Sequence, residues 1–141
     1  LLIESLAIDA GRFARVVHPS AQISSNATIG YNVVAMAGVV ITSNAQIGNH
    51  VCLLPNAVVH HDSRVGDWSM VGTNVAIAGG VDIGSNSFIG SGSSIKNGVR
   101  IGSGALIGIG STVIHDVPPG AIVAGNPARI LRHESASETS D

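Results

Sequence analysis

A strict six-residue repeat runs through most of this 141-residue chain. Every sixth residue from Val17 to Val113 is Val, Ile or Leu, and Ala35 is the one exception. An amphipathic helix repeats its apolar residues about every 3.6 positions and a lone strand about every 2, so neither explains a period of six. The repeat predicts a solenoid, in which identical short units stack on one another.

The other positions of the hexad suggest how each unit turns. With the aliphatic residue as position one, position five holds only Ala, Val or Ser, and position four is mostly Asn or Gly. Asn and Gly accept a left-handed backbone at low cost. We interpret each hexad as a short strand and a corner, three of which complete a coil. The chain is therefore predicted to be all-β, a left-handed parallel β-helix of just under six coils. Another β-solenoid or a silk-like repeat is the alternative.

The repeat also divides the chain. The expected segments are a lead-in or remnant of a missing domain (1–16), the β-helix (17–118), a C-terminal loop and short helix (119–133), and a disordered tail (134–141). The helix is expected because Asn126-Pro127 resembles an N-cap followed by proline at the first helical position.

Composition excludes several kinds of partner. Charged residues make up only 11% of the chain and the net charge is −2, so neither nucleic acid nor an anionic membrane is expected to bind. No apolar run approaches the roughly 20 residues that a membrane-spanning helix needs. The single Cys52 cannot form an intramolecular disulfide and fits a reducing, cytoplasmic compartment.

The first candidate for chemistry is His61 with Asp62. Together with His60, they end a stretch from residue 16 that contains no Asp, Glu, Lys or Arg. Residues 18 apart stack in a β-helix, so Gly79 is expected to adjoin His61 and leave room for a ligand. An imidazole can act as a general base near neutral pH, and a carboxylate can orient it. A solvated polar corner without function is the alternative.

Other candidates are weaker. His50 lies near His60 and His61 in sequence but on a different corner, so we expect no metal site within one chain. Cys52 has no charged neighbour in sequence and is expected to be structural rather than nucleophilic. Trp68 replaces Asn or Gly at a corner, where it could pack on another chain, on a substrate or on the β-helix itself.

Three parts of the sequence resemble a known family: the ending from Gly108 to Arg129, the start from Val17 to Ala21, and the His61-Asp62 pair. The repeat and the ending resemble the hexapeptide-repeat acyltransferases. More narrowly, the chain is similar to the NeuD/PglD-like group of sialic acid and sugar acetyltransferases. The resemblance implies a homotrimer with sites between adjacent β-helices. It implies acetyl-CoA as co-substrate, no metal, and a small-molecule acceptor such as a sugar or nucleotide-sugar.

The resemblance also implies residue roles. His61 would be the general base, supported by Asp62, and would take a proton from an acceptor amine or hydroxyl. The backbone amide of Gly79 would polarise the thioester carbonyl of acetyl-CoA. The remaining coenzyme contacts would be the amides of Ser91 and Ile109 for the pantetheine arm, with His115 and Arg129 for the phosphates and adenine.

The chain departs from the family at a few places. Met70 and Leu54 stand where relatives often have His and Asn, and relatives usually carry an N-terminal Rossmann-like domain. Two other functions therefore stay open. One is a metal enzyme of the same fold, like the γ-carbonic anhydrases, and the other is a non-catalytic β-helix used for assembly.

Overall fold

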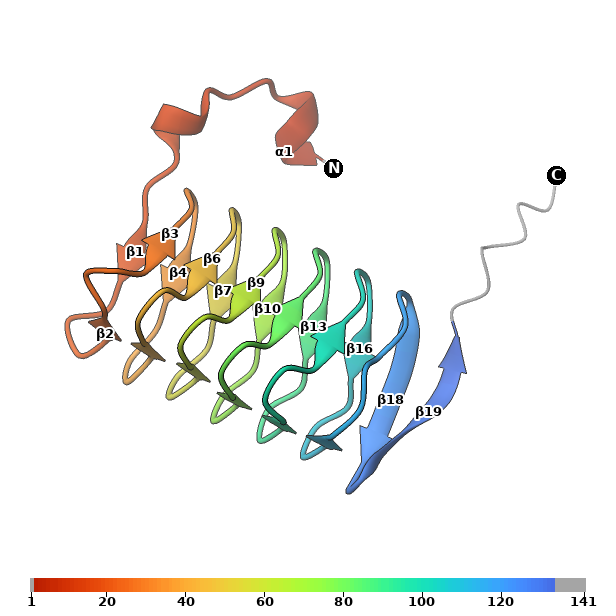
Figure 1. The fold of residues 1–141 in the computed structure, drawn as a ribbon. Helices are drawn as coiled ribbons and strands as arrows, with labels where there is room; N and C mark the ends of the chain where they lie inside the picture. The colour runs from red at the N-terminus through yellow and green to blue at the C-terminus, as the bar shows by residue number, and fades with distance from the viewer. Residues whose placement is uncertain (1, 134–141) are drawn as a thin grey trace, which may run out of the picture.

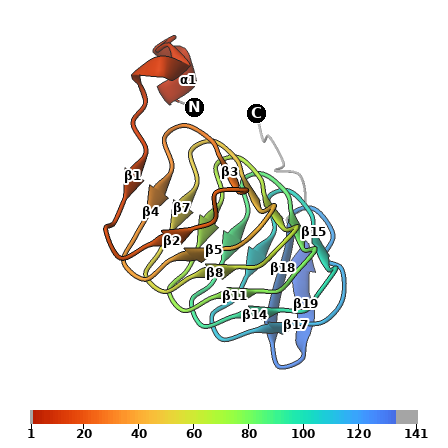
Figure 2. The ribbon, with the colours of Figure 1, turned by 60° about the vertical axis from the view of Figure 1, so that its left-hand side comes forward.

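The computed structural model describes residues 2–133 and has the predicted β-helix. Parallel strands form three faces, and from β1 to β17 the strands that pair are 18 residues apart (Figures 1 and 2). Face A contains β1 (Val16–Val17), β4 (Val34–Ala35), β7 (Cys52–Leu53), β10 (Met70–Val71), β13 (Phe88–Ile89), β16 (Leu106–Ile107), β18 (Ala121–Gly125) and β19 (Ala128–His133). Face B contains β2 (Gln22–Ile23), β5 (Val40–Ile41), β8 (Val58–Val59), β11 (Ala76–Ile77), β14 (Ser94–Ile95) and β17 (Thr112–Val113). Face C contains β3 (Thr28–Ile29), β6 (Gln46–Ile47), β9 (Arg64–Val65), β12 (Asp82–Ile83) and β15 (Arg100–Ile101).

The core follows the hexad. Position one is the second residue of each strand from β1 to β17, and its side chain is buried from Ala35 onward. Position-five residues pack between these aliphatic side chains, and they too are buried from Val33 onward. Ile23 and Ile29 are only partly buried, because the first coil has a stacked neighbour on one side alone. The apolar column that the sequence predicted is therefore the interior of the β-helix.

Position four turns the corners, as predicted. From Asn32 to Gly110 every position-four residue has a positive φ. Three of them are neither Asn nor Gly: His50 (φ 57°), Asp62 (φ 59°) and Trp68 (φ 62°). A left-handed conformation costs such residues roughly 1–2 kcal/mol, so contacts of their side chains have to offset that cost.

The predicted C-terminal helix is wrong. Residues 128–133 form β19, which pairs antiparallel with β18, and no helix follows β17 in the described residues (Figure 1). Asn126-Pro127, whose peptide bond is cis, lies in the turn between the two strands. The reason is tertiary: β18 extends face A beyond β16, and its other edge needs a partner for its backbone groups. The expected disordered tail, 134–141, lies outside the described residues.

The lead-in contains α1 (Leu2–Ser5) and the short 3₁₀ helix η1 (Ala10–Arg12). It contacts the corner between faces C and A through Phe13, whose ring stacks on Tyr31 and meets His50 edge-on. Trp68 stacks on His50 with centroids 3.7 Å apart. Trp68 therefore packs on its own β-helix, which is one of the three arrangements that the sequence allowed. No helix among the described residues is long and apolar enough to cross a membrane.

Candidate active site

His61 lies on the corner between β8 and β9, which joins faces B and C, and its imidazole covers Gly79 on the next coil. A Cβ atom added to Gly79 would stand 2.6 Å from Cε1 and 2.7 Å from Nε2 of His61. A side chain at position 79 would therefore displace the ring. The proximity that the 18-residue stacking predicted is present, and it depends on glycine.

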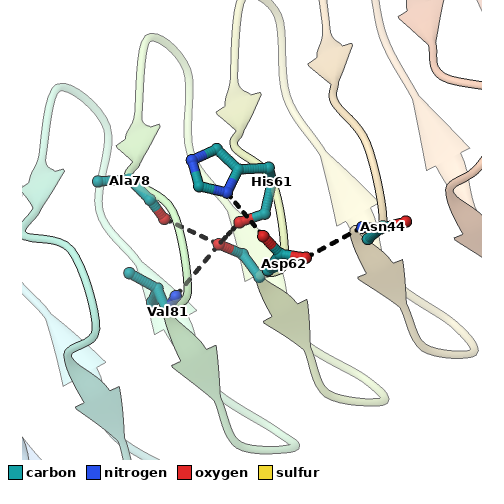
Figure 3. A network of polar contacts seen from close by, with 6 residues as sticks. Asn44, His61, Asp62, Ala78 and Val81 are labelled. Atoms are coloured by element: carbon teal, nitrogen blue, oxygen red, sulfur yellow. Dashed lines mark hydrogen bonds and ion pairs between the residues drawn. The ribbon is translucent and has the colours of Figure 1, made fainter.

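Asp62 holds the imidazole by one of its nitrogens. Nδ1 of His61 lies 2.8 Å from Oδ2 of Asp62, and Nδ2 of Asn44 donates to Oδ1 of Asp62 at 3.1 Å (Figure 3). The hydrogen bond from His61, then the one from Asn44, hold the pKa of the Asp62 carboxyl below its usual range. A carboxylate that accepts from Nδ1–H leaves Nε2 as the basic nitrogen. Both side chains are more than half exposed, so a substrate can reach them.

The backbone amides at hexad position three, beside the corners, are a second set of groups that can bind a ligand. Some are capped by a side chain 18 residues later: the Thr73 amide donates to Oγ of Ser91 at 3.1 Å. Within residues 2–133 the amides of Gly79, Ser91 and Ile109 donate no hydrogen bond. The residue stacked on Ser91 is Ile109, which is 79% exposed and offers no acceptor. These three amides are free to bind a ligand.

The proposed coenzyme contacts do not gather at one corner. Ser91 and Ile109 lie between faces A and B, whereas His61, Gly79 and His115 lie between faces B and C. His115 and Arg129 line the same cavity, of about 340 Å³, at the C-terminal end of the β-helix. Face B separates the two corners, so within a single chain the sites of Ser91 and His61 are apart.

Two residues of this corner were not singled out from the sequence. Asn44 holds Asp62 from 18 residues away, at the same hexad position, so the 18-residue stacking could have found it. Ser63 is 1% exposed and binds the Gly79 coil from the interior. Its signal was weak, because Ser is one of three residue types found at position five.

No group of three His, Cys, Asp or Glu side chains in the described part of the chain is arranged to hold a metal. His50 is engaged instead by Nδ2 of Asn32, 2.8 Å from its Nδ1, and by Trp68. Cys52 lies half-buried on face A, and burial raises the pKa of its thiol, which makes it a poorer nucleophile.

Comparison with known proteins finds relatives of the same fold. Residues 44–79 match the bacterial transferase hexapeptide family (six repeats). PerB from Caulobacter crescentus, solved with CoA and GDP-perosamine, is 37% identical over 84% of this chain and 57% of its own, with a TM-score of 0.83. The acetyltransferase domain of PglB from Neisseria gonorrhoeae, solved with acetyl-CoA, is 30% identical over 91% of this chain and 61% of that one, with a TM-score of 0.85. A comparison with curated proteins finds no match.

WeeI from Acinetobacter baumannii is also 30% identical, with a TM-score of 0.85, over 92% of this chain and 62% of that protein. The chain thus spans about three fifths of the length of these relatives. It is a left-handed β-helix protein, and its residues 44–79 match the bacterial-transferase hexapeptide repeats. Within that class it resembles the sugar acetyltransferases, as the sequence predicted.

Proposed function

We propose that the protein is an acetyl-CoA-dependent acetyltransferase whose acceptor is a nucleotide-linked sugar. The acceptor group is an amine in the first place and a hydroxyl as the alternative. The observation that carries the proposal is the basic Nε2 of His61 beside the unoccupied amide of Gly79. The solved relatives support the substrates: PerB was crystallised with CoA and GDP-perosamine, and PglB with acetyl-CoA. A mutant of GDP-perosamine N-acetyltransferase in which one histidine is replaced by alanine has also been crystallised with CoA and GDP-perosamine. That mutant supports the choice of a histidine as the catalytic base.

In this reaction Nε2 of His61 takes a proton from the acceptor as its nitrogen or oxygen attacks the thioester carbonyl. Negative charge develops on the carbonyl oxygen, and the Gly79 N–H donates to it. The C–S bond then breaks, and CoA leaves with the proton that His61 had taken. Asp62 stays ionised throughout, and it orients the ring and stabilises the imidazolium.

The remaining residues would hold the coenzyme. The amides of Ser91 and Ile109 are 18 residues apart and stack on one corner, about 4.8 Å from each other, which suits the two amide carbonyls of a pantetheine arm. His115 and Arg129, in their shared cavity, would contact the phosphates and adenine. CoA supplies the acetyl group as a thioester, and no metal takes part in these steps.

A homotrimer completes the proposed site. Every outward residue on face A from β1 to β16 is apolar, among them Met70, Phe88 and Leu106, which are each about two fifths exposed. The same position on face C carries Arg64, Asp82 and Arg100. Face A adjoins the Ser91 corner. Packing it against the His61 corner of the next copy would therefore bring the two halves of the site together. Such a contact joins different surfaces of two copies, and a ring of three closes it.

Three measurements test these proposals. Calorimetry should detect binding of acetyl-CoA and of CoA, and acetyl transfer to GDP-perosamine or another amino-sugar nucleotide should release free CoA thiol. No binding at millimolar acetyl-CoA would overturn the proposed function. Analytical ultracentrifugation should give a molecular mass of three times 14.2 kDa, the mass of one chain. Phe88→Glu should reduce this mass to that of one chain, whereas Gln46→Glu on face C should leave the trimer intact.

A further inference from the structure

Ser63 is a buried hydroxyl that ties the coil of His61 to the coil of Gly79. Its Oγ donates to the carbonyl oxygen of Ala78 at 2.8 Å and accepts from the amide of Val81 at 3.2 Å (Figure 3). Oγ also lies 3.4 Å from the carbonyl oxygen of His61, a longer contact than the one to Ala78. Ser63 therefore holds both ends of the segment 78–81, whose two middle residues are glycines.

The carbonyl of Ala78 and the N–H of Gly79 belong to one peptide group. In a trans peptide these two bonds point in opposite directions. The oxygen is fixed in the interior by Ser63, so the N–H is directed outward, at the corner where the imidazole of His61 lies. The glycines at 79 and 80 have no side chains that would hold the peptide in this orientation. Val81 is buried and anchors the far end of the segment.

We propose that Ser63 is a positioning residue, which aims and polarises the Gly79 amide toward the thioester carbonyl of acetyl-CoA. The proposal rests on the proposed function. A hydrogen bond accepted at the oxygen of a peptide strengthens the peptide's N–H as a donor. An oxyanion donor also works best when its position is fixed before the reaction. Ser63 does both from inside the β-helix, without touching the substrate.

The same arrangement recurs beneath a second free amide. Oγ of Ser93 donates to the carbonyl oxygen of Gly108 at 3.0 Å and accepts from the amide of Ser111 at 3.2 Å. Oγ of Ser111 also donates to this carbonyl oxygen, at 2.6 Å. The peptide so held carries the N–H of Ile109, one of the two amides assigned to the pantetheine arm. Ser63 and Ser93 thus hold two peptides that the proposed chemistry uses, one on each of the two corners.

Ser69 supplies a control inside the same molecule. Its Oγ donates to the carbonyl oxygen of Gly84 at 3.1 Å and accepts from the amide of Ser87 at 3.1 Å. Like Ser63, it is 1% exposed. The peptide that it holds faces the corner between faces C and A, away from His61 and from Ser91. Loss of either hydroxyl removes a pair of interior hydrogen bonds, although the carbonyl oxygen of Gly84 also accepts from Oγ of Ser87 at 2.9 Å. Only Ser63 faces the proposed reaction.

Position five offers a substitution pair that isolates the hydroxyl. Val occupies this position at many corners, including Val81, which stacks directly on Ser63. Ser63→Val and Ser63→Thr add nearly the same volume and differ in whether a hydroxyl is kept. We expect Ser63→Val to lower kcat about tenfold, less than the roughly 10²–10³-fold loss on removing an oxyanion donor outright, because the N–H remains. KM for acetyl-CoA should stay within about twofold, and Ser63→Thr and Ser69→Val should both keep nearly the parent kcat.

An activity-independent measurement completes the test. In protein without coenzyme, labelling with ¹³C-alanine and ¹⁵N-glycine selects the four Ala-Gly peptides of the chain, at 10–11, 37–38, 78–79 and 124–125. The Gly79 amide resonance is the one that Gly79→Ala removes. Ser63→Val should shift it, and Ser69→Val should not. An unshifted Gly79 resonance overturns the inference, whatever the activity. Equal losses of kcat in Ser63→Val and Ser69→Val also overturn it, because both serines would then be merely structural. A shifted resonance in a protein that binds no acetyl-CoA would support the positioning by Ser63 and contradict the proposed function alone.

Discussion

The corner between faces C and A and the corner between faces B and C have the same backbone but differ in their amides. On the first, the Tyr31 amide donates to Oδ1 of Asn49 at 3.0 Å, and the Asn49 amide donates to Oδ1 of Asp67 at 2.8 Å. At these two positions the outward side chain of one coil caps the amide of the coil before it. Aromatic rings, among them Trp68, cover the same corner.

On the second corner the residue stacked on His61 is Gly79, which has no side chain to cap anything. The amide of Gly79 is itself left open, and the imidazole lies in the space that a side chain would fill. The difference shows how a repetitive fold acquires a site. Every corner without proline at position three has an outward amide, and the residue 18 positions later decides whether that amide is closed for stability or open to a ligand.

The largest expected effect comes from removing the base at the open corner. His61→Ala should lower kcat/KM for acetyl transfer about 10³-fold, within the range for general bases, and leave the Kd for CoA nearly unchanged. His60→Ala is the matched control, because His60 is exposed and its side chain forms no hydrogen bond in the described residues. If the two variants lost activity equally, or if neither did, His61 would not be the base.

Partly closing the open corner should have the next largest effect. Gly79→Ala places a methyl group within 2.7 Å of ring atoms of His61, and its three nearest contacts are all with that ring. The ring should move while the fold stays, because the backbone at Gly79 has no positive φ to strain. We expect kcat to fall about 10²-fold with thermal unfolding almost unchanged. Gly98→Asn, at a positive-φ position with nothing within 4 Å, should retain activity.

Neutralising the carboxylate that orients His61 should have a smaller effect. Asp62→Asn keeps a residue that tolerates the positive φ, and we expect kcat to fall about tenfold because the imidazolium loses its counter-charge. The variant should also respond differently to acid. The pKa of Asp62 is lowered in the folded state, so its ionised form stabilises the fold above the ordinary carboxyl pKa. That stability is lost as the pH falls through the lowered value.

Unfolding followed from neutral pH down to pH 2 therefore separates the two proteins. The parent should lose more stability below about pH 4 than Asp62→Asn does, and the two curves should run parallel between pH 5 and 8. A difference that developed only above pH 5 would contradict its assignment to Asp62.

Much of the fold could be predicted because the repeat contains the same information many times. Inward position one, small position five and positive φ at position four each recur along the chain, so a single exception such as Trp68 does not obscure them. The C-terminal hairpin has no such redundancy. Asn126-Pro127 is compatible locally with a helix start or with a turn, and the free edge of β18 decides between them.

The candidate site likewise has contacts that the sequence predicts and contacts that it does not. The 18-residue stacking of the repeat is enough to predict that Gly79 lies against His61, and the hydrogen bond from His61 to Asp62 joins neighbours in sequence. The part played by Ser63 could not be predicted, because it depends on which carbonyl a buried hydroxyl meets on the next coil. In the proposed trimer the coenzyme contacts depend on a second copy and on a ligand, neither of which is encoded in the spacing of one chain.

The smallest expected effect comes from opening the closed corner. Asp67→Ala removes the acceptor for the Asn49 amide, which should lower the free energy of unfolding by about 1 kcal/mol, since water can replace part of the lost bond. It should leave kcat unchanged. Asp82→Ala is the control of equal charge: Asp82 makes only a 3.8 Å exposed ion pair with Arg64, and its loss should change the unfolding free energy by less than about 0.5 kcal/mol. If Asp67→Ala lowered kcat, the capped corner would also belong to the site, and the division between closed and open corners would be wrong.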